Sequence, residues 1–401
     1  KSSTTQQVVW EEKHPQDDIY LIAGRFERYT QPATTAITSY VYLRDPDKAL
    51  AQKYLDTTAQ YIAMYNKLLG PYPYTKFALV ENFWETGYGM PSFTLLGPKV
   101  VRFPFILHTS YPHEILHNYW GNGVFVDYTQ GNWSEGLTAY LADHLVAEQG
   151  RKGEEYRRDV LQKYTDFVNK EKDFPIIRFV SRHSASSEAV GYGKTMMFFH
   201  MLRQELGDEA FTKVLRRFYQ QFKFQPATFA DLLDTFNTTT GQDLTQRFEQ
   251  WVHRTGAPNL VLHSAETKPN DQGYILTLTV EQVQPGGEPY RMHVPLAVTL
   301  EVDKTRLPAE FRLTLPLPLT LDEVKARLPA VPILTLPPAL TFPPALRKMP
   351  PPATIDTSLV AVTLPLVTVR FPAAARPTDA LDTGVAVRLR LPPEKRPTLP
   401  E

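Results

Sequence analysis

The chain of 401 residues contains no cysteine, so disulfide bridges, thiolate zinc ligands and cysteine nucleophiles are excluded. No apolar run reaches the roughly 18 residues that a transmembrane helix needs, so none is predicted. Basic and acidic residues number 43 each and the formal net charge is zero, so composition does not indicate a nucleic acid or an anionic membrane as partner. The length predicts two or three domains.

The part of the chain from residue 301 onward lacks Trp, Tyr, His, Asn and Gln and holds a single glycine, yet it contains 19 of the 35 prolines. Its Leu-Pro and Pro-Pro-Ala units alternate like strands, but proline is excluded from the centre of a sheet. We find no catalytic motif in this segment. Catalytic chemistry must therefore be sought upstream.

Two histidines stand four residues apart in His113-Glu114-Ile115-Leu116-His117. On a helix, positions i and i+4 lie on the same face, so both imidazoles can bind one metal ion, with Glu114 beside any water that the metal carries. The pattern also arises by chance, in which case the histidines bond to carbonyl groups on a buried helix. The flanking sequence favours the metal site.

A second predicted helix supplies a third ligand. Residues 108–120 and 134–147 have helical periodicity, and the glycine-rich segment between them reads as a loop that lets the second helix fold back. Glu135 can then join His113 and His117 and leave the fourth metal position open for water. Three protein ligands and one open position are typical of a zinc hydrolase, here with one Zn²⁺ per chain.

The residues around this site fit the chemistry of amide hydrolysis. Zinc lowers the pKa of a bound water and polarises the substrate carbonyl, and Glu114 can act as general base and then as general acid. The oxyanion needs a second electrophile. Tyr192 is the candidate, because the flanking glycines Gly191 and Gly193 leave space near a ligand. Three further histidines are interpreted as ordinary surface or core residues: His108, His144 and His183.

The motifs resemble those of the aminopeptidase N-like zinc metallopeptidases, the gluzincin family that includes leukotriene hydrolase, in its bacterial form. The resemblance covers about residues 8–260 and includes Trp133-Ser134-Glu135-Gly136 and Gly191-Tyr192-Gly193-Lys194. It implies a thermolysin-like catalytic domain, with His113, His117 and Glu135 as ligands. It further implies Glu114 as base and Tyr192 as transition-state stabiliser. The loop before Glu135 is one residue shorter than the family's usual spacing, a change that loops tolerate.

A second departure concerns substrate binding. The family's substrate-aligning strand usually reads Gly-x-Met-Glu-Asn, and its glutamate holds the free amino terminus of the peptide. Gly89 and Met90 fit this pattern, but Pro91 occupies the glutamate position, which removes the anion that would pair with an ammonium group. Pro91 is expected on an edge strand or a bulge, where an extended peptide can still add as a strand. Glu85, a few residues upstream, is either an alternative anion or an ordinary solvated carboxylate of the loop.

The predicted fold class is α+β. Residues 1–44 are interpreted as the end of an amino-terminal β domain, 45–256 as the thermolysin-like catalytic domain, and 257–401 as a β-rich region. Within the last, residues 259–302 alternate as in a β-sandwich. The first residues contain no initiator methionine and do not form a signal peptide, so we expect a processed or excised chain that has lost an amino-terminal domain.

Finer expectations can be stated for the first half of the chain. Strands are predicted at residues 7–12, 18–30, 37–43, 76–82 and 87–96. A helix is predicted at 45–69, with Asp45 and Pro46 at its start. By resemblance to bacterial relatives, we expect an extracytoplasmic location.

The sequence therefore predicts a zinc-dependent peptidase, most simply aminopeptidase-like. Because of Pro91, endopeptidase action or another altered specificity remains an alternative, as does hydrolysis of a non-peptide substrate. A third alternative is an inactive zinc-containing scaffold that binds peptides. Glu114 and Tyr192 count against the scaffold, because a binding module needs neither residue. The oligomeric state is left open.

Overall fold

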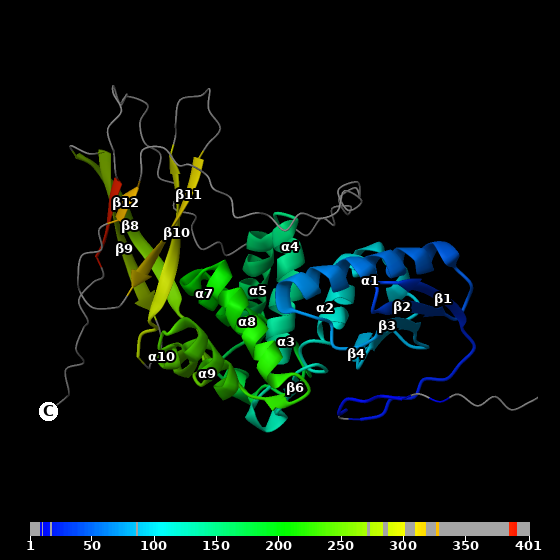
Figure 1. Cartoon of the computed structure of the whole chain (residues 1–401). Coiled ribbons are helices and arrows are strands. Elements are labelled where there is room, and N and C mark those ends of the chain that lie inside the picture. The colour runs from blue at the N-terminus through cyan, green and yellow to red at the C-terminus, as the bar shows by residue number, and fades with distance from the viewer. Residues whose placement is uncertain are drawn as a thin grey trace, which may run out of the picture. The chain divides into compact units, whose positions relative to one another are not determined.

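The computed structural model describes residues 9, 11–16, 18–85, 87–270, 273–283, 288–300, 309–317, 326–328 and 385–390. They belong to two compact units that divide between Thr255 and Gly256; the sequence predicts this division between residues 256 and 257. Figure 1 shows helices together with a sheet in the first unit and strands in the second. In the described part of the chain, no helix is both long and apolar enough to cross a membrane.

The first unit contains a five-stranded sheet with the order β1-β2-β3-β5-β4. Its strands are β1 (Glu27–Pro32), β2 (Thr38–Leu43), β3 (Lys76–Glu81), β4 (Gly87–Met90) and β5 (Phe93–Leu96). The three central strands are parallel, and the edge strands β1 and β4 are antiparallel to their neighbours. Because β2 pairs with β3, the sheet runs across the domain boundary that we predicted between residues 44 and 45.

Three of the predicted strands need correction. The strand predicted at residues 18–30 begins only at Glu27, and Ile19 is 90% exposed, because no neighbouring strand pairs with this segment. Of the strand predicted at residues 7–12, the residues that the structure describes lie in no strand, and the others lie outside the described part. The single strand predicted at 87–96 is a hairpin of β4 and β5.

Helix α1 (Lys48–Leu69) connects β2 to β3 and contacts β1 and β2 (Figure 1). Its N-cap is Asp47, whose carboxylate accepts a hydrogen bond from the Leu50 amide at 2.9 Å, so the helix starts three residues later than predicted. Gly70, at φ +120°, ends it. This conformation is open to glycine and strained for other residues.

Buried tyrosines on α1 hold the segment that leads to the histidine motif. The hydroxyl of Tyr54 donates to the Val101 carbonyl at 2.8 Å, and that of Tyr61 donates to the Leu107 carbonyl at 3.0 Å. Each phenol thereby satisfies its buried polar group with a backbone acceptor. These two hydrogen bonds fix the segment that precedes helix α2 (Ser110–Leu116), which carries the histidine motif.

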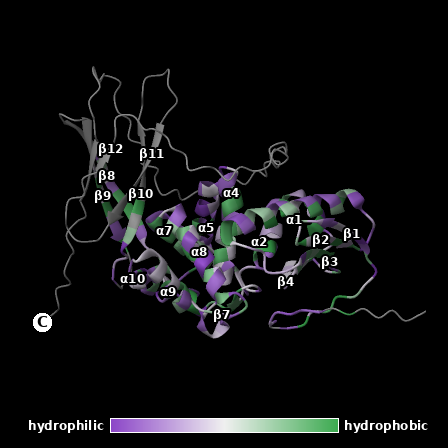
Figure 2. Ribbon diagram, viewed as in Figure 1, coloured by the Kyte–Doolittle hydropathy of each residue, from purple (hydrophilic) through white to green (hydrophobic). Residues whose placement is uncertain are grey.

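The remaining helical elements of the first unit lie between Val100 and Val252. They are η1 (Val100–Arg102), η2 (Pro104–His108), α2 (Ser110–Leu116), η3 (Tyr128–Gln130), α3 (Ser134–Ala139), η4 (Tyr140–His144), α4 (Leu145–Gln149), α5 (Gly153–Phe167), η5 (Ile176–Arg178), α6 (Ala185–Glu188), η6 (Ala189–Lys194), α7 (Thr195–Leu206), α8 (Asp208–Phe222), α9 (Phe229–Thr240) and α10 (Thr245–Val252). The short strands β6 (Phe125–Val126) and β7 (Pro226–Ala227) pair in parallel. Helix α8 carries both hydrophobic and hydrophilic residues (Figure 2), and its buried face includes Phe211, Val214, Leu215 and Phe218.

The second unit is built of strands. A four-stranded sheet has the order β12-β13-β9-β8, and β10 pairs with β11 in a two-stranded sheet. The bounds are β8 (Asn259–Asn270), β9 (Gly273–Val283), β10 (Met292–Leu300), β11 (Ala309–Leu317), β12 (Ala326–Leu328) and β13 (Val385–Arg390). Pro295 and Pro316 lie in the two-stranded sheet, where every strand is an edge. Most of the proline-rich region from 301 to 401 lies outside the described residues.

Candidate metal centre and active site

Helix α2 carries the first half of the site. Its amide ladder joins His117 N to His113 O at 3.1 Å, so the two imidazoles stand on consecutive turns with ring centroids 4.8 Å apart. The helix is shorter than the predicted 108–120, because the chain turns after His117. This turn brings the Trp120 carbonyl within 2.9 Å of His117 Nδ1, which a continuing helix would not allow.

Helix α3 brings Glu135 to the same point. Glu135 Oε2 lies 3.4 Å from His113 Nε2 and 3.3 Å from His117 Nε2. The approach requires Gly136, since a Cβ at that position would overlap Thr195 of α7. The loop before Glu135, one residue shorter than is usual in the family, is compatible with this convergence.

The three side chains fit a metal ion. One ligand atom from each of His113, His117 and Glu135 lies within 4.8 Å of the other two. Glu135 Oε2 is buried and has no hydrogen-bond partner among the described residues, a costly arrangement unless a cation binds it. Both imidazoles use Nδ1 for a hydrogen bond, His113 with Asp143 and His117 with Trp120, which leaves both Nε2 atoms facing the carboxylate. Two nitrogens and one oxygen are a donor set typical of catalytic zinc.

Glu114 lies beside this cluster, underneath strand β4. Burial raises the pKa of its carboxyl group, and the neighbouring His113 and His117 imidazoles oppose the shift only in part. A Cβ built on Gly89 would lie 2.8 Å from Glu114 Oε2 and 3.1 Å from His117 Cβ. The backbone of β4 thus approaches the carboxylate as closely as a glycine allows.

This approach makes Gly89→Ala a test of the site's geometry. The added methyl must displace the Glu114 carboxylate, and displacements of about 1 Å can lower turnover by about 10²-fold. We expect turnover to fall by about 10- to 100-fold with metal content retained. Gly87→Ala is the matched control, because its Cβ would meet Glu114 Oε1 only at 3.6 Å, an ordinary contact. Equal activity of the two variants would contradict the predicted crowding at Gly89.

Tyr192 lies beside His113. It lies in η6, a π-helical turn in the continuous helical run of α6, η6 and α7. The phenol ring stacks on the His113 imidazole with centroids 6.3 Å apart and an interplanar angle of 19°. Burial and the Glu135 carboxylate raise the pKa of Tyr192, which keeps the hydroxyl protonated and able to donate. π-Helical turns recur at functional sites.

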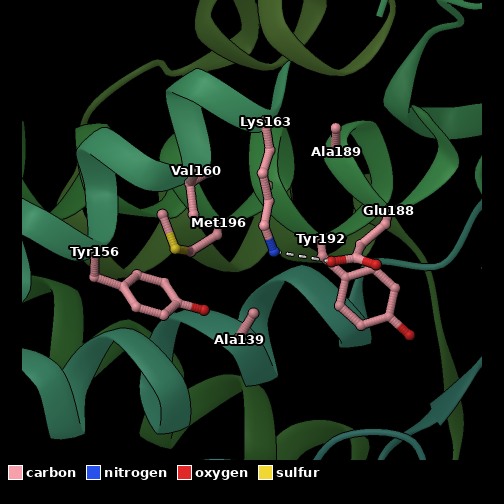
Figure 3. A pocket seen from close by; sticks show the side chains of 9 residues that line it. Ala139, Tyr156, Val160, Lys163, Glu188, Ala189, Tyr192 and Met196 are labelled. Atoms are coloured by element: carbon pink, nitrogen blue, oxygen red, sulfur yellow. Dashed lines mark hydrogen bonds and ion pairs between the residues drawn. The ribbon is translucent and has the colours of Figure 1, made fainter. Parts of the chain in front are cut away.

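A small cavity of about 50 Å³ adjoins Tyr192. In Figure 3, Lys163 reaches toward the Glu188 carboxylate, which lies next to the Tyr192 ring, and the Tyr156 side chain lies across the cavity. The Lys163–Glu188 ion pair measures 3.2 Å. The space holds only a few waters or a very small group, so we assign no substrate side chain to it.

The other histidines do not join the metal ligands in the described part of the chain. His108 is half-buried in η2, and His183 is exposed. His144 is fully buried in η4, where its Nε2 lies 2.7 Å from Arg157 Nη1. Burial, together with the charges of Arg157 and Arg203, lowers the pKa of His144 to about 3. His144 is therefore neutral in the folded protein.

A neutral buried histidine makes stability depend on pH. Unfolded, His144 titrates near its ordinary pKa of about 6.5, so between about 6.5 and 3 the unfolded state binds more protons. The contribution to stability is complete above this window and is lost as pH falls through it, by at most about 1.4 kcal/mol per pH unit. Chemical unfolding of the parent chain and of His144→Gln, compared from pH 7 to 4, should show this difference in slope. Parallel curves would contradict the assignment.

The predicted substrate-binding residues divide between two places. Gly89 and Met90 lie in β4, at the edge of the sheet; Gly89 is next to Glu114, whereas Met90 packs against the hydrophobic cluster of the sheet. Pro91 lies outside the strand, in the two-residue turn between β4 and β5, where Ser92 has φ +65° and donates its amide to Asn118 at 2.7 Å. This tight turn offers no carboxylate. Pro91 thus follows an edge strand and does not lie within one. The missing amide of proline predicts the edge of a sheet, but the motif does not predict the turn.

Glu85 is engaged elsewhere. Its carboxylate accepts hydrogen bonds from the Lys99 amide at 3.0 Å and the Val100 amide at 3.3 Å, at the start of η1. These are the contacts of a capping side chain at the start of a helix, so the negative charge of the Glu85 carboxylate is held by backbone amides.

Comparison with known proteins identifies the segment that carries the site. Residues 108–251 match the Peptidase family M1 domain. The chain is 24% identical over 265 residues to mitochondrial aminopeptidase 2 of Saccharomyces cerevisiae, covering 61% of this chain and 28% of that protein. It is also 24% identical over 208 residues to aminopeptidase N of Haemophilus influenzae, covering 47% and 22%. The chain thus spans less than a third of the length of these relatives.

Similar solved structures include an M1 zinc metallopeptidase from Deinococcus radiodurans, at 21% identity and a TM-score of 0.47, covering 59% of this chain and 53% of that one. Native leukotriene A4 hydrolase from Saccharomyces cerevisiae is similar at 17% identity and a TM-score of 0.47, covering 58% and 40%.

The matched segment, which contains both histidines, Glu135 and Tyr192, is a metallopeptidase domain. Over this segment the chain is similar to peptidase family M1, and the relatives that it matches are aminopeptidases.

Sequence reasoning missed two contacts that hold the metal-facing histidines. These are Asp143, on His113, and the Trp120 carbonyl, on His117. A carbonyl leaves no signal in a sequence. Asp143 could have been considered as a carboxylate on the same predicted helix as Glu135, but the periodicity of a regular helix places it on another face.

Proposed function

We propose that the chain is a zinc-dependent peptidase that hydrolyses peptide bonds and acts as an aminopeptidase on short or unfolded peptides. The observation that carries the proposal is the convergence of His113, His117 and Glu135 at one point, with Glu114 beside it and strand β4 passing over both. The catalytic domain would have the thermolysin-like architecture that its motifs imply.

Zinc held by His113, His117 and Glu135 would supply a Lewis acid and lower the pKa of a water molecule. Glu114 takes a proton from the attacking water as the oxygen–carbon bond forms. It then delivers that proton to the amide nitrogen as the carbon–nitrogen bond breaks, which releases an amine and a carboxylic acid. The position of Glu114, one residue from His113 and under the edge strand, suits both transfers.

Tyr192 would donate a hydrogen bond to the oxyanion of the tetrahedral intermediate. Two observations support this role. The ring stacks on His113, so it lies next to the ligand cluster, and the π-helical turn of η6 lies within a helix whose residues pack closely against α3. A donor that is fixed in place needs little reorganisation as negative charge develops.

Strand β4 is where the peptide would bind. It is the last strand of the sheet on this side, so its outer backbone groups are free to pair with an extended chain. Tyr88 on β4 and the preceding Phe83 and Trp84 are 46%, 66% and 48% exposed. These aromatic rings offer apolar contact to substrate side chains.

Endopeptidase action is the second candidate, and the turn after β4 favours it. Pro91 and Ser92 occupy the turn where the family's amine-binding glutamate would follow, and the Glu85 carboxylate caps η1. A free amino terminus therefore lacks the expected anion among the described residues at this turn.

Peptides of one sequence with free and with acetylated amino termini separate the two candidates. The zinc-loaded chain is incubated with each peptide, and the products are identified by mass spectrometry. Release of the first residue from the free peptide alone supports the aminopeptidase. Equal internal cleavage of both peptides supports the endopeptidase. Absence of cleavage of either by zinc-loaded protein would contradict peptide hydrolysis.

A further inference from the structure

The two metal-facing imidazoles are held by different kinds of acceptor. His117 Nδ1 lies 2.9 Å from the Trp120 carbonyl oxygen, whereas His113 Nδ1 lies 2.6 Å from Asp143 Oδ2. The His113 and Asp143 side chains are only 13% and 20% exposed. A carboxylate at this distance from a largely buried imidazole forms a strong, charge-assisted hydrogen bond.

The helix after Glu135 is distorted at the point where Asp143 stands. Helices α3 and α4 are continuous through η4, a π-helical turn over Tyr140–His144. In a regular α-helix, two residues eight positions apart point about 80° away from each other around the axis. A π-turn takes up one extra residue, which rotates Asp143 back toward the face that carries Glu135. Both carboxylates then reach His113, one at each ring nitrogen.

We propose that Asp143 is the positioning residue for His113. Its carboxylate accepts the Nδ1 proton, which fixes the imidazole in the tautomer whose Nε2 lone pair faces Glu135 and the metal, and makes that nitrogen a stronger donor. Asp143 touches neither the metal nor the substrate. The inference rests on the zinc site of the proposed function and adds a second requirement to it.

A purely structural Asp143 would behave differently from a positioning one. It would contribute to the free energy of unfolding through its ion pair, and its loss would leave zinc affinity unchanged in molecules that remain folded. A positioning Asp143 sets the orientation and basicity of a ligand, so its loss changes zinc affinity directly. Loss of such a contact typically weakens metal binding by about 10- to 100-fold.

Asp143→Asn is the test variant, because asparagine keeps the size and removes the charge. Glu148→Gln is the matched control: Glu148 lies on α4, next along the same helical run, and pairs with Arg203 at 2.7 Å. Zinc dissociation constants are measured by competition with a chromophoric chelator, on folded protein selected by its circular dichroism. We expect binding to weaken by about 10- to 100-fold for Asp143→Asn and by less than about twofold for Glu148→Gln.

Equal zinc affinity of Asp143→Asn and the parent chain would overturn the proposal and leave the zinc site itself intact. Failure of the parent chain to bind zinc would instead refute the proposed function. If Asp143→Asn does not fold, nitrogen-15 spectra of the zinc-loaded parent chain decide the matter. A His113 Nδ1 proton that resonates further downfield than that of His117, whose Nδ1 faces a carbonyl oxygen, supports the proposal, and equal shifts of the two protons overturn it.

Discussion

Replacing Glu114 with glutamine is expected to lower kcat for peptide hydrolysis by about 10²- to 10⁴-fold, the usual contribution of a general acid–base. Glutamine has the same shape but cannot take a proton from water. Because Glu114 is not one of the three side chains that converge as ligands, the variant should retain zinc.

Metal analysis and initial rates on the same samples check this expectation. The zinc content of Glu114→Gln should equal that of the parent chain, so that loss of activity reports on the base alone. Turnover within about threefold of the parent, at equal zinc content, would show that another group activates the water.

Tyr192→Phe is the second large effect. Removing a single oxyanion donor typically lowers kcat by about 10²- to 10³-fold. The ring that stacks on His113 is kept in phenylalanine, so the variant isolates the hydroxyl. We expect kcat to fall by that amount and KM to change little, because the interaction forms in the transition state.

Tyr156→Phe is the control for this variant. Tyr156 lines the same cavity and is also a half-buried phenol, but its ring lies across the cavity from Tyr192 (Figure 3). Its activity should stay close to that of the parent chain. If both variants lose activity equally, the cause is packing around the cavity and not a hydrogen bond to the oxyanion.

The parts of the fold that depend on periodicity could be predicted from the sequence. The helix predicted at 134–147 corresponds to the helical run over 134–149, and the helical stripe containing Phe211 and Phe218 is buried. These features repeat at intervals that a sequence displays directly. The strand predicted at 18–30 was wrong over its first part, because alternation indicates a strand only where a partner strand is present.

The arrangement around the site was only half predictable. The spacing of His113, Glu114 and His117 on one helix fixes their relation to each other. The position of Asp143 depends on a π-helical turn, which shifts a helix by one residue and leaves its hydrophobic pattern almost unchanged. In the same way, Pro91 predicts the edge of a sheet, but the two-residue turn depends on contacts such as that of Ser92 with Asn118.

The metal content of the purified chain tests the central claim most directly. After dialysis against metal-free buffer and addition of excess zinc, removal of unbound ion and elemental analysis should find about one zinc per chain. A His113→Ala, His117→Ala double variant should retain none. A folded parent chain that takes up no divalent ion, or a double variant that binds as much as the parent, would contradict the metal centre and the hydrolytic function that depends on it.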